Sequence, residues 1–304
     1  MPSKSVADLF SEFTLSKKQK RLANEQRIGA HPQIALIDEQ IRILLLQKLD
    51  QEVNNKDASQ TDQSLAALTH EKQTLIDREV SLIPASCSTC HDTGVVNGGY
   101  CTCFLQEVYK SLYSAIDIKK ISHTFQAFDA SIFDAATPLP TGKTQREHME
   151  LIRQVCEDFT ADFSGAAKRG LLLLGNTGLG KTYLLECMAK EAYARGTDVL
   201  FIRAGDLFRT FFAHRMGEDI PLSFLYDARL LLLDDLGTEP PTQNVTAEYL
   251  YELIDKRQGK PTVIASNLKT SSDIVGRYNE RIASRLKSKQ HYLQLVFEGK
   301  DVRK

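Results

Sequence analysis

The segment at residues 175–182 has the residue types and the spacing of a phosphate-binding loop. It reads GNTGLGKT, which is a glycine, four residues, and then glycine, lysine and threonine. Four leucines, Leu171–Leu174, precede the loop, and the helix-forming run YLLECMAKEAYA follows it. Inward-pointing N–H groups and a helix dipole attract phosphate oxygens in this succession of buried strand, glycine loop and helix N-terminus. The complete pattern favours a nucleoside triphosphate site over a plain glycine turn.

The same loop supplies two side chains that act on a bound triphosphate. Lys181 is placed to reach the β- and γ-phosphates, and the hydroxyl of Thr182 is a ligand for Mg²⁺. The predicted nucleotide-binding residues are Gly175, Asn176, Thr177, Gly178, Leu179, Gly180, Lys181 and Thr182.

Two acids follow a second apolar run. Leu230–Leu233 read as a buried strand, and Asp234 and Asp235 come directly after it. We expect Asp234 to hold Mg²⁺, directly or through water, and Asp235 to orient and polarise the attacking water. The four leucines argue against an exposed acidic pair. Many ATPases of this type have glutamate at the second position, and aspartate is one methylene shorter, so we hypothesise slow basal hydrolysis that a partner accelerates.

Three further polar residues extend this hydrolytic set. Asn267 ends the run PTVIASN, where it would position the water or sense the γ-phosphate, although asparagine at a strand end is also a common turn residue or helix cap. Arg281 and Arg285 lie four residues apart on one face of a helix expected at 276–286. Such guanidinium groups can cross a subunit boundary and stabilise transition-state charge. Surface ion pairs are the alternative, and the spacing alone does not decide between them.

A cluster of cysteines in the segment CSTCHDTGVVNGGYCTC predicts a metal site. Cys87 and Cys90 have two residues between them, and Cys101 and Cys103 have one. Paired thiolates at this spacing can close a tetrahedral structural zinc site, and the metal would supply the folding energy of a loop-rich segment. His91 in place of one cysteine is the alternative ligand set. A redox Cys-x-x-Cys is disfavoured because that motif brings no second pair.

The composition is that of a soluble, intracellular protein. With 304 residues, 42% of them hydrophobic, the chain is expected to form about two domains with packed cores. The net charge is −1, so any contact with nucleic acid must come from local patches. The start MPSKSVADLF carries no signal-peptide run, and no stretch of about 18 apolar residues occurs. We therefore expect a cytoplasmic protein with no membrane partner, and we expect Cys156 and Cys187 to be buried in helices.

Residues 33–83 contain neither proline nor glycine and predict two helices. Apolar residues recur at helical spacing over 34–49 and again over 65–80, with a polar break at 54–62 between them. Two such helices are expected to pair as an antiparallel hairpin. The first apolar stripe is broad, so it either builds the core of its own domain or binds a partner. Its extra members are Leu36, Leu44 and Leu46.

From residue 144 onward the pattern changes to alternating strands and helices. A linker at 119–143 with no sustained period comes first, and a helix is expected over Thr144–Phe163. Short apolar strands separated by helical stretches are typical of a parallel sheet covered by helices on both faces. The predicted fold class is therefore α/β, preceded by a helical region. The expected strands are Gly170–Leu174, Val199–Ile202, Arg229–Asp234, Pro261–Ala265 and Tyr292–Phe297.

In their order along the chain, GNTGLGKT, LLLLDDLG, VIASN and NERIASRL resemble the motifs of an AAA+ ATPase. In detail they resemble those of the DnaC/DnaI-type replicative helicase loaders and the related IstB transposition ATPases. The cysteine segment is similar to the zinc knuckle of DnaI-like loaders, and HTFQAFDASIFD is similar to the segment that joins the two domains in this family. The resemblance implies a helical zinc-binding domain at 1–118, a linker at 119–143, and an AAA+ P-loop ATPase domain at 144–304 without a C-terminal lid.

The resemblance also implies a role for each residue that matches a family motif. Walker A and Walker B residues hold ATP and Mg²⁺, a first sensor contacts the γ-phosphate region, and an arginine finger reaches the next subunit. The matching residues are Lys181 and Thr182, Asp234 and Asp235, Asn267, and Arg285 with Arg281 close behind, while Arg303 is a short match to a second sensor.

For function, the family implies loading of the hexameric replicative DNA helicase onto single-stranded DNA in replication initiation or restart. The N-terminal domain of loaders grips the helicase, and the ATPase core forms homo-oligomers and touches DNA. A transposition helper is one alternative, which the zinc knuckle and the long helical front disfavour. A slowly hydrolysing, nucleotide-switched adaptor is another, which Asp235 keeps open.

DNA contacts are expected where cations and aromatic residues occur together, because such surfaces attract a backbone and stack on bases. The segment between the second and third strands has this composition, although its aromatic residues are more often part of a core. The candidates are Arg209, Arg215, Phe208, Phe211 and Phe212, with Arg285, Lys287 and Lys289 as a second group.

Overall fold

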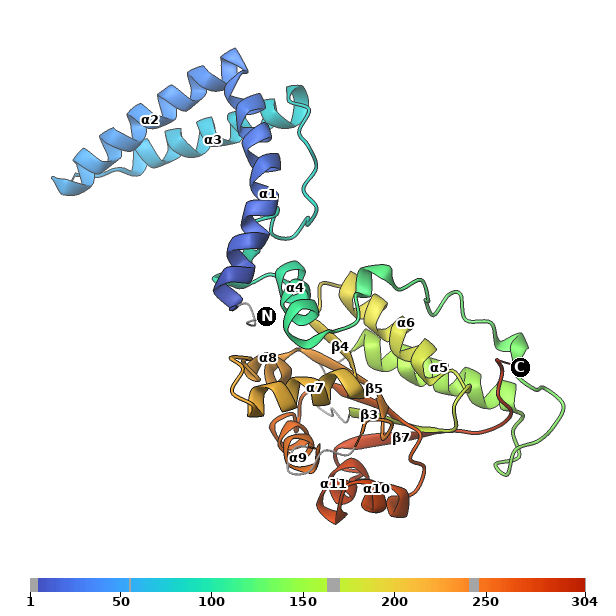
Figure 1. The fold of residues 1–304 in the computed structure, drawn as a ribbon. Helices are drawn as coiled ribbons and strands as arrows, with labels where there is room; N and C mark the ends of the chain where they lie inside the picture. Colours follow the sequence, from blue (N-terminus) through green and yellow to red (C-terminus); the bar gives the residue numbers. More distant parts are fainter. Residues whose placement is uncertain (1–4, 55, 163–169, 241–245, 304) are drawn as a thin grey trace. The chain divides into compact units, whose positions relative to one another are not determined.

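Figure 1 shows the protein as a computed structural model, which describes residues 5–54, 56–162, 170–240 and 246–303. The chain divides into two compact units. One comprises residues 10–99, and the other comprises residues 100–304 together with the first nine.

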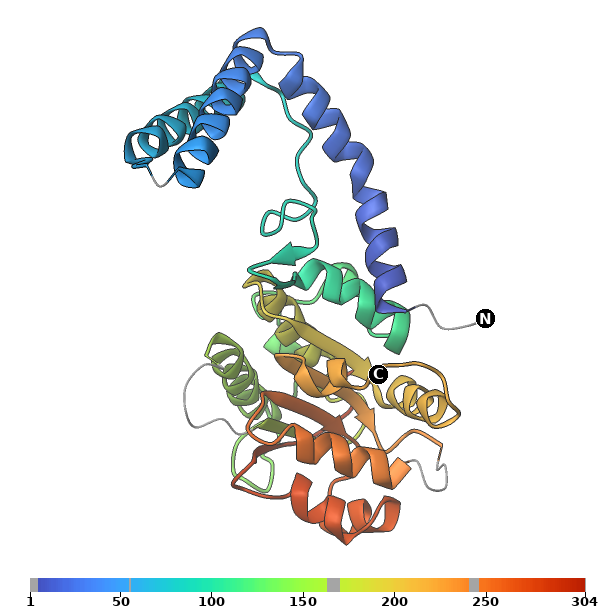
Figure 2. The ribbon, with the colours of Figure 1, turned by 90° about the vertical axis from the view of Figure 1, so that its left-hand side faces the viewer.

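The first unit is built from most of one long helix, α1 (Val6–Gly29), and two complete ones, α2 (Pro32–Val53) and α3 (Ser59–Glu79). Helices α2 and α3 lie side by side in Figures 1 and 2. Lys48 pairs with Asp62 at 2.6 Å, and Lys72 pairs with Asp38. The end of α2 therefore meets the start of α3, and the start of α2 meets the end of α3, so the two helices are antiparallel. The predicted helical hairpin is confirmed.

The connection between α2 and α3 is shorter than the sequence indicates. Helix α3 begins at Ser59, inside the polar break expected at 54–62. Asp57 explains the early start, because its carboxylate accepts a hydrogen bond from the N–H of Ser59 at 2.9 Å. An acceptor at this position satisfies a backbone donor that the first turn leaves without an intrahelical partner.

The apolar residues of α2 divide between two faces. Ile34 and Ile37 are buried, so part of the stripe builds the core of this unit. A second set is between 48% and 80% exposed, and we call it the outer face of α2. It consists of Leu36, Ile43, Leu45, Leu46, Leu49 and Val53.

A short hairpin and a helix continue the chain after α3. Strands β1 (Val95–Val96) and β2 (Gly99–Tyr100) are joined by Asn97 and Gly98, both with positive φ, as two-residue hairpin turns require. Helix α4 (Thr102–Tyr113) follows, and then two 3₁₀ turns, η1 (Ile118–Lys120) and η2 (Ala130–Ile132), lie in the expected linker.

Helix α5 (Gln145–Ala161) begins where the sequence predicts. The hydroxyl of Thr144 accepts from the N–H of Glu147, and the Glu147 carboxylate accepts from the N–H of Thr144, which is a complete capping box. The expected last residue of this helix, Phe163, lies outside the described residues.

The larger unit contains a five-stranded sheet with the order β4-β5-β6-β3-β7, in which the paired strands are all parallel. Every predicted strand is present within one or two residues of its expected bounds, and the predicted α/β class is confirmed. The strands are β3 (Gly170–Gly175), β4 (Val199–Arg203), β5 (Leu230–Leu236), β6 (Thr262–Ser266) and β7 (Tyr292–Phe297).

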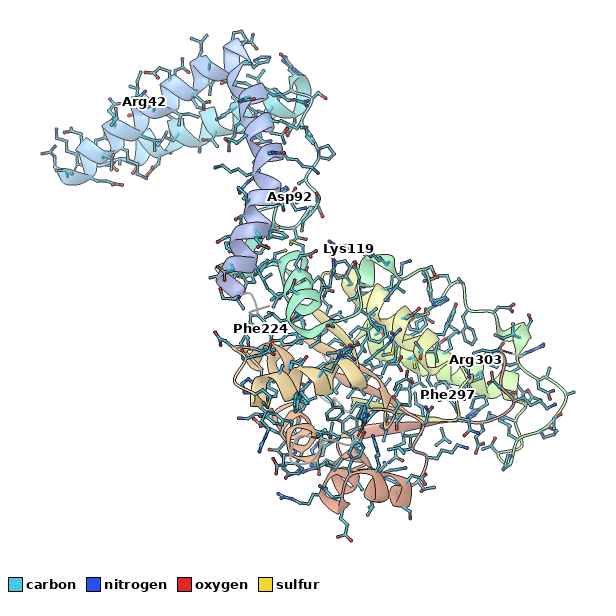
Figure 3. All side chains as sticks on the ribbon, in the orientation of Figure 1. Arg42, Asp92, Lys119, Phe224, Phe297 and Arg303 are labelled. Atoms are coloured by element: carbon cyan, nitrogen blue, oxygen red, sulfur yellow. The ribbon has the colours of Figure 1, made fainter. Side chains whose placement is uncertain are left out.

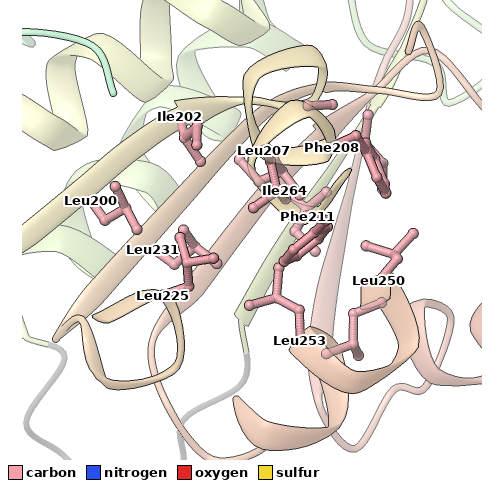
Figure 4. Close-up of a cluster of buried hydrophobic side chains, with 14 of the residues drawn as sticks. Leu200, Ile202, Leu207, Phe208, Phe211, Leu225, Leu231, Leu250, Leu253 and Ile264 are labelled. Carbon is pink, nitrogen blue, oxygen red and sulfur yellow. The ribbon is translucent and has the colours of Figure 1, made fainter. Parts of the chain in front are cut away.

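Helices cover both faces of this sheet (Figure 1). On one face α5 and α6 (Lys181–Ala194) pack on Leu171, Leu173 and Phe201. On the other face the packing helices are α7 (Ala204–Arg215), α8 (Ser223–Asp227) and α9 (Thr246–Lys256). Figure 4 shows this second core, where Leu200, Ile202 and Leu231 meet side chains of these helices. Alternate residues of each strand serve opposite cores, so the strands are apolar throughout.

The helix expected at 276–286 is two helices in the structure. Helix α10 (Ser271–Arg277) ends before Tyr278, and α11 (Glu280–Leu286) begins after Asn279. Asn279 causes the break, because its side chain accepts a hydrogen bond from the N–H of Ile282 at 2.9 Å and so starts a new helix.

The described residues after β7, 298–303, contain no helix. Within the described part of the chain, no helix combines the length and the apolar character needed to cross a membrane.

Candidate functional site

The glycine loop lies between β3 and α6, at the carboxyl end of a central strand. Gly178 and Gly180 have φ values of +75° and +91°, which side-chain-bearing residues rarely adopt. A Cβ at Gly178 would lie 1.9 Å from the carboxylate of Asp301, so the approach of the two segments also requires glycine there. The structure therefore contains the predicted glycine loop, and the backbone of this loop leads into the N-terminus of α6.

Lys181 is nearly fully buried, and its ammonium group is held by three oxygens. It donates to the carbonyls of Gly175 and Asn176, both at 2.7 Å, and to Oδ1 of Asn267 at 2.8 Å. Burial lowers the pKa of Lys181, and the nearby charges of Asp234 and Asp235 oppose this shift. The structure thus brings Asn267, which directly follows β6, to the predicted phosphate-binding lysine.

Asp234 lies near the carboxyl end of β5 and is 1% exposed. Its Oδ2 accepts a hydrogen bond from the Thr182 hydroxyl at 2.9 Å, and its Oδ1 accepts one from the N–H of Asp235 at 2.9 Å. Burial, and then the charge of Asp235, raise the pKa of Asp234 to about 6. A carboxylate and a hydroxyl in contact, next to a phosphate-binding loop, fit the oxygen donors that Mg²⁺ takes beside substrate phosphates.

Asp235 is aimed by an irregularity in the sheet. The pairing of β5 with β6 shifts between Leu233 and Leu236, so that Asp234 and Asp235 together face a single residue of the partner strand. Asp235 also has a left-handed backbone, with φ +56°. Bulges of this kind redirect side chains next to functional sites, and Asp235 lines the cavity in front of the glycine loop.

This cavity has a volume of about 710 Å³, and its walls come from the linker, the glycine loop with α6, the residues around the ends of β5 and β6, and the segment after β7. Thr177 to Thr182, Asp235, Thr238 and Asn267 form the polar end. The other end is formed by the linker and the first turns of α6, and its members are His123, Ala127, Phe128, Asp129, Ile132, Phe133, Tyr183 and Glu186.

The linker residues of this cavity are candidate site residues that the sequence patterns miss. The rings of His123 and Tyr183 are 4.5 Å apart, Phe128 meets Tyr183 edge-on at 5.9 Å, and Phe128 stacks on Phe133 at 5.7 Å. His123 also pairs with Glu186. An aromatic pocket beside a phosphate loop is a suitable seat for a planar base. The only available signal was the density of aromatic residues in HTFQAFDASIFD, which has no period.

The segment after β7 returns to the glycine loop. The N–H of Val302 donates to the carbonyl of Gly178 at 3.0 Å, and Arg303 lines the cavity while pairing with Asp301 at 3.1 Å. Figure 3 labels Arg303 at the end of the segment that begins after Phe297. Arg303, which is only a short sequence match to a second sensor, thus lies at the site.

Arg281 and Arg285 are not among the described residues that line this cavity. Both lie on α11, and the side chains of both contact Tyr251 of α9. The guanidinium of Arg281 is 4.5 Å from the centre of the Tyr251 ring, and Arg285 bonds the Tyr251 hydroxyl at 3.3 Å and pairs with Asp255 at 3.1 Å. The predicted spacing on one helix face is confirmed, and neither arginine serves the site of its own chain in this geometry.

The four cysteines of the predicted metal site come together. The sulfur atoms of Cys87, Cys90, Cys101 and Cys103 all lie within 4.8 Å of one another, and three of the four residues are buried. Sulfurs around a tetrahedral zinc ion with Zn–S bonds near 2.3 Å are about 3.8 Å apart, so the donor set and its spacing fit zinc. His91 is not a member of the cluster, which favours the four-cysteine set.

The candidate DNA contacts divide by burial. Phe208 and Phe211 are buried in the core of Figure 4 and stack edge-on at 5.8 Å, so they do not reach solvent. Phe212 is 48% exposed on the same helix. Arg209 pairs with Asp206, and Arg215 lies 3.8 Å from Glu248. Cys156 and Cys187 are buried in α5 and α6, as predicted.

A glycine loop after β3, a polar residue after the neighbouring parallel strand β6 and a buried acid on β5, the strand beyond it, define a P-loop ATPase core of the AAA+ class. Residues 147–275 match the family described as IstB-like ATP binding protein. This part of the larger unit is therefore similar to an IstB-like ATP-binding domain.

Individual relatives agree with this class. The ATP-binding protein of insertion sequence IS1162 from Pseudomonas fluorescens is 32% identical over 117 residues, which is 38% of this chain and 50% of that protein. The replicative helicase loader DnaI of Bacillus subtilis is 25% identical over 167 residues, covering 53% of this chain and 49% of that protein. The resemblance to DnaC/DnaI-type loaders and IstB ATPases is confirmed, although the chain spans only about half the length of the curated relatives it matches.

Among solved structures, a crystal structure of DnaI aligns with 62% of this chain and 94% of its own, at 23% identity and a TM-score of 0.46.

Proposed function

We propose that the protein is an ATP-dependent loader that places a hexameric replicative DNA helicase on single-stranded DNA in the cytoplasm, at replication initiation or restart. One observation carries this proposal: the chain combines an ATP cavity with a four-cysteine cluster and a helical region that has an exposed apolar face. The similarity to DnaI, a replicative helicase loader, supports it. The proposed functional divisions are a partner-binding domain at 1–118, a linker at 119–143 and an ATPase domain at 144–304, although residues 100–118 belong to the larger compact unit.

Hydrolysis uses the residues around the cavity. Lys181 exchanges its carbonyl partners for oxygens of the β- and γ-phosphates. Thr182 and Asp234 would hold Mg²⁺, which would neutralise charge on these phosphates. Asp235 accepts a proton from water as the water oxygen bonds to the γ-phosphorus. The bond from that phosphorus to the β–γ bridging oxygen breaks, which leaves ADP and inorganic phosphate. Asn267 orients the water.

Arg285, with Arg281 beside it, completes the site of a neighbouring subunit in a homo-oligomer. Stacking on Tyr251 and pairing with Asp255 hold the two guanidinium groups in a defined direction before assembly. In well-studied cases, an arginine supplied from the next subunit stabilises transition-state charge and raises the rate of hydrolysis by about 10³–10⁵-fold. Arg303 acts as a second sensor in its own subunit.

The partners bind elsewhere. The outer face of α2 binds the helicase, because an apolar surface of this extent is unfavourable in water and is covered on association. Cys87, Cys90, Cys101 and Cys103 would hold zinc, which would stabilise residues 87–103. Single-stranded DNA binds to two groups of residues. The first combines cations with an exposed aromatic ring and consists of Arg209, Arg215 and Phe212. The second consists of Lys287 and Lys289.

A loading assay tests this function directly. The full-length protein, the replicative helicase of the source organism and circular single-stranded DNA are mixed with ATP, and the helicase that stays on DNA is measured. We expect Leu46→Asp, on the outer face of α2, to lose helicase binding and loading while it still binds ATP. Leu151→Asp, which changes an exposed leucine of α5, is the matched control and should load normally. Wild-type protein that neither binds nor loads the helicase would refute the proposal.

A transposition helper is the second candidate, because the matched family and the IS1162 relative are ATP-binding proteins of insertion sequences. Stimulation of a transposase by the ATP-bound protein, with no helicase loading, would favour it. ATP binding without measurable hydrolysis, with or without single-stranded DNA, would instead favour a nucleotide-switched adaptor.

A further inference from the structure

Glu239 is a buried carboxylate that the proposed hydrolysis does not use. It lies four residues after Asp235, in the turn that follows β5, and its side chain is 0% exposed. A buried carboxylate costs free energy unless donors surround it, so its partners indicate what it does.

Those partners come from two separate parts of the ATPase core. The carboxylate accepts from the N–H of Gly237 at 2.8 Å through one oxygen. Through the other it accepts from the Tyr278 hydroxyl at 2.5 Å and from the Arg277 guanidinium at 3.3 Å. Burial, reinforced by the charge of Glu239, raises the pKa of Tyr278, so the hydroxyl keeps the proton that it donates. Glu239 therefore bridges the turn after β5 and the junction of α10 with α11.

The turn is attached to the ATP site. The N–H and the hydroxyl of Thr238 both donate to the carbonyl of Asp235, at 3.2 and 2.8 Å, and both residues line the cavity. Gly237, at φ +102°, packs closely enough on the side chain of Leu268 that a Cβ would lie 2.8 Å from it. The turn is thus confined between Asp235 and the residue that follows Asn267.

The junction carries the arginine helix. Tyr278 follows the last residue of α10, and Asn279 caps α11 immediately afterwards. Arg281 and Arg285 lie on α11. Because only Asn279 separates Tyr278 from this helix, fixing the Tyr278 side chain fixes the start of α11.

We propose that Glu239 is a positioning residue that couples the turn after Asp235, at the ATP site of its own subunit, to the helix that presents Arg285 to the next subunit. The inference rests on the proposed function, in which Arg285 acts across a subunit boundary. Glu239 thereby links neighbouring ATP sites. Its carboxylate fixes the turn after Asp235 in its own subunit, and it also fixes the direction of Arg285, which enters the ATP site of the next subunit.

A subunit-mixing experiment separates this role from a local one. Donor subunits carry Lys181→Ala, so they cannot hydrolyse ATP but keep their arginine helix. Acceptor subunits carry Arg285→Ala, so they keep the site but lack the arginine, and excess donor should restore their hydrolysis. Adding Glu239→Gln to the donor is expected to lower the restored kcat by about 10- to 100-fold, the effect of a misplacement near 1 Å. Tyr278→Phe in the donor should lower it less, and Glu280→Gln, at an exposed acid of α11, should not.

Each result decides the inference. Full restoration by donors carrying Glu239→Gln, with a melting temperature like that of the parent donor, would overturn it. If Glu239→Gln does not fold, Tyr278→Phe removes only one hydroxyl and decides in its place. An equal loss of restored hydrolysis with the Glu280→Gln control would also overturn the inference, because any change of charge on α11 would then be enough to lower the restored kcat. Failure of the parent donor to restore hydrolysis would instead remove the proposed arginine contact, and the inference with it.

Discussion

Replacing Asp234 by asparagine is expected to stabilise the nucleotide-free protein and to abolish Mg²⁺-dependent ATP hydrolysis. The carboxylate is buried and is bonded to the Thr182 hydroxyl and to the N–H of Asp235. Asparagine keeps one acceptor for that N–H, and its amide group can donate to the hydroxyl. The substitution therefore retains the shape of the site and removes only the charge.

The size of the effect follows from the pKa of Asp234. Burial and the charge of Asp235 raise this pKa from 3.8 to about 6. The folded state holds the proton more tightly than the unfolded state, so stability is complete below about pH 4 and falls as the pH rises to about 6. A shift of about two pH units corresponds to about 3 kcal/mol at about 1.36 kcal/mol per unit. Asparagine carries no such cost at any pH.

The free energy of unfolding in urea, without nucleotide or Mg²⁺, measures this gain. We expect Asp234→Asn to be more stable than wild type by up to about 3 kcal/mol at pH 8, and by about half of that at pH 5. Asp219→Asn, at an exposed acid, is the matched control and should stay within about 0.5 kcal/mol of wild type. A variant that is less stable than wild type at pH 8, or a gain that does not depend on pH, would refute the reasoning.

Three further outcomes are expected. Phe128→Ala removes an aromatic wall of the cavity and should weaken ATP binding about 10-fold, or about 1.4 kcal/mol, without lowering kcat at saturation. Titration with a fluorescent ATP analogue measures the Kd, and an unchanged Kd would place the base elsewhere. Asp235→Glu should raise basal kcat in a phosphate-release assay, because the longer side chain brings the carboxylate nearer to the attacking water. Rapid hydrolysis by wild type with no gain in the variant would contradict this. Cys90→Ser should lower bound zinc, measured by elemental analysis, from about one ion per chain, and should lower the melting temperature of the metal-loaded protein. Equal zinc content in the variant and wild type would exclude the cysteine cluster as the site.

Local patterns were sufficient for the glycine loop, the strands and the helical hairpin. The loop is specified by glycines that alone accept its backbone angles, and the strands by apolar runs that a two-sided parallel sheet requires. The break between α10 and α11 was missed although Asn279 is a good cap, because the apolar spacing continues across it and a single capping residue is a weak signal beside a periodic one.

The sequence by itself determined which residues can bind phosphate, metal and water, because the chemistry of lysine, threonine, aspartate and cysteine does not depend on the fold. The tertiary structure alone decided where these groups meet. The irregular pairing of β5 aims Asp235, the non-periodic linker forms the aromatic end of the ATP cavity, and the turn after β5 reaches α10 through Glu239. Each of these joins residues far apart in the chain, and their proximity follows from the packing of the sheet and its helices, which no local spacing encodes.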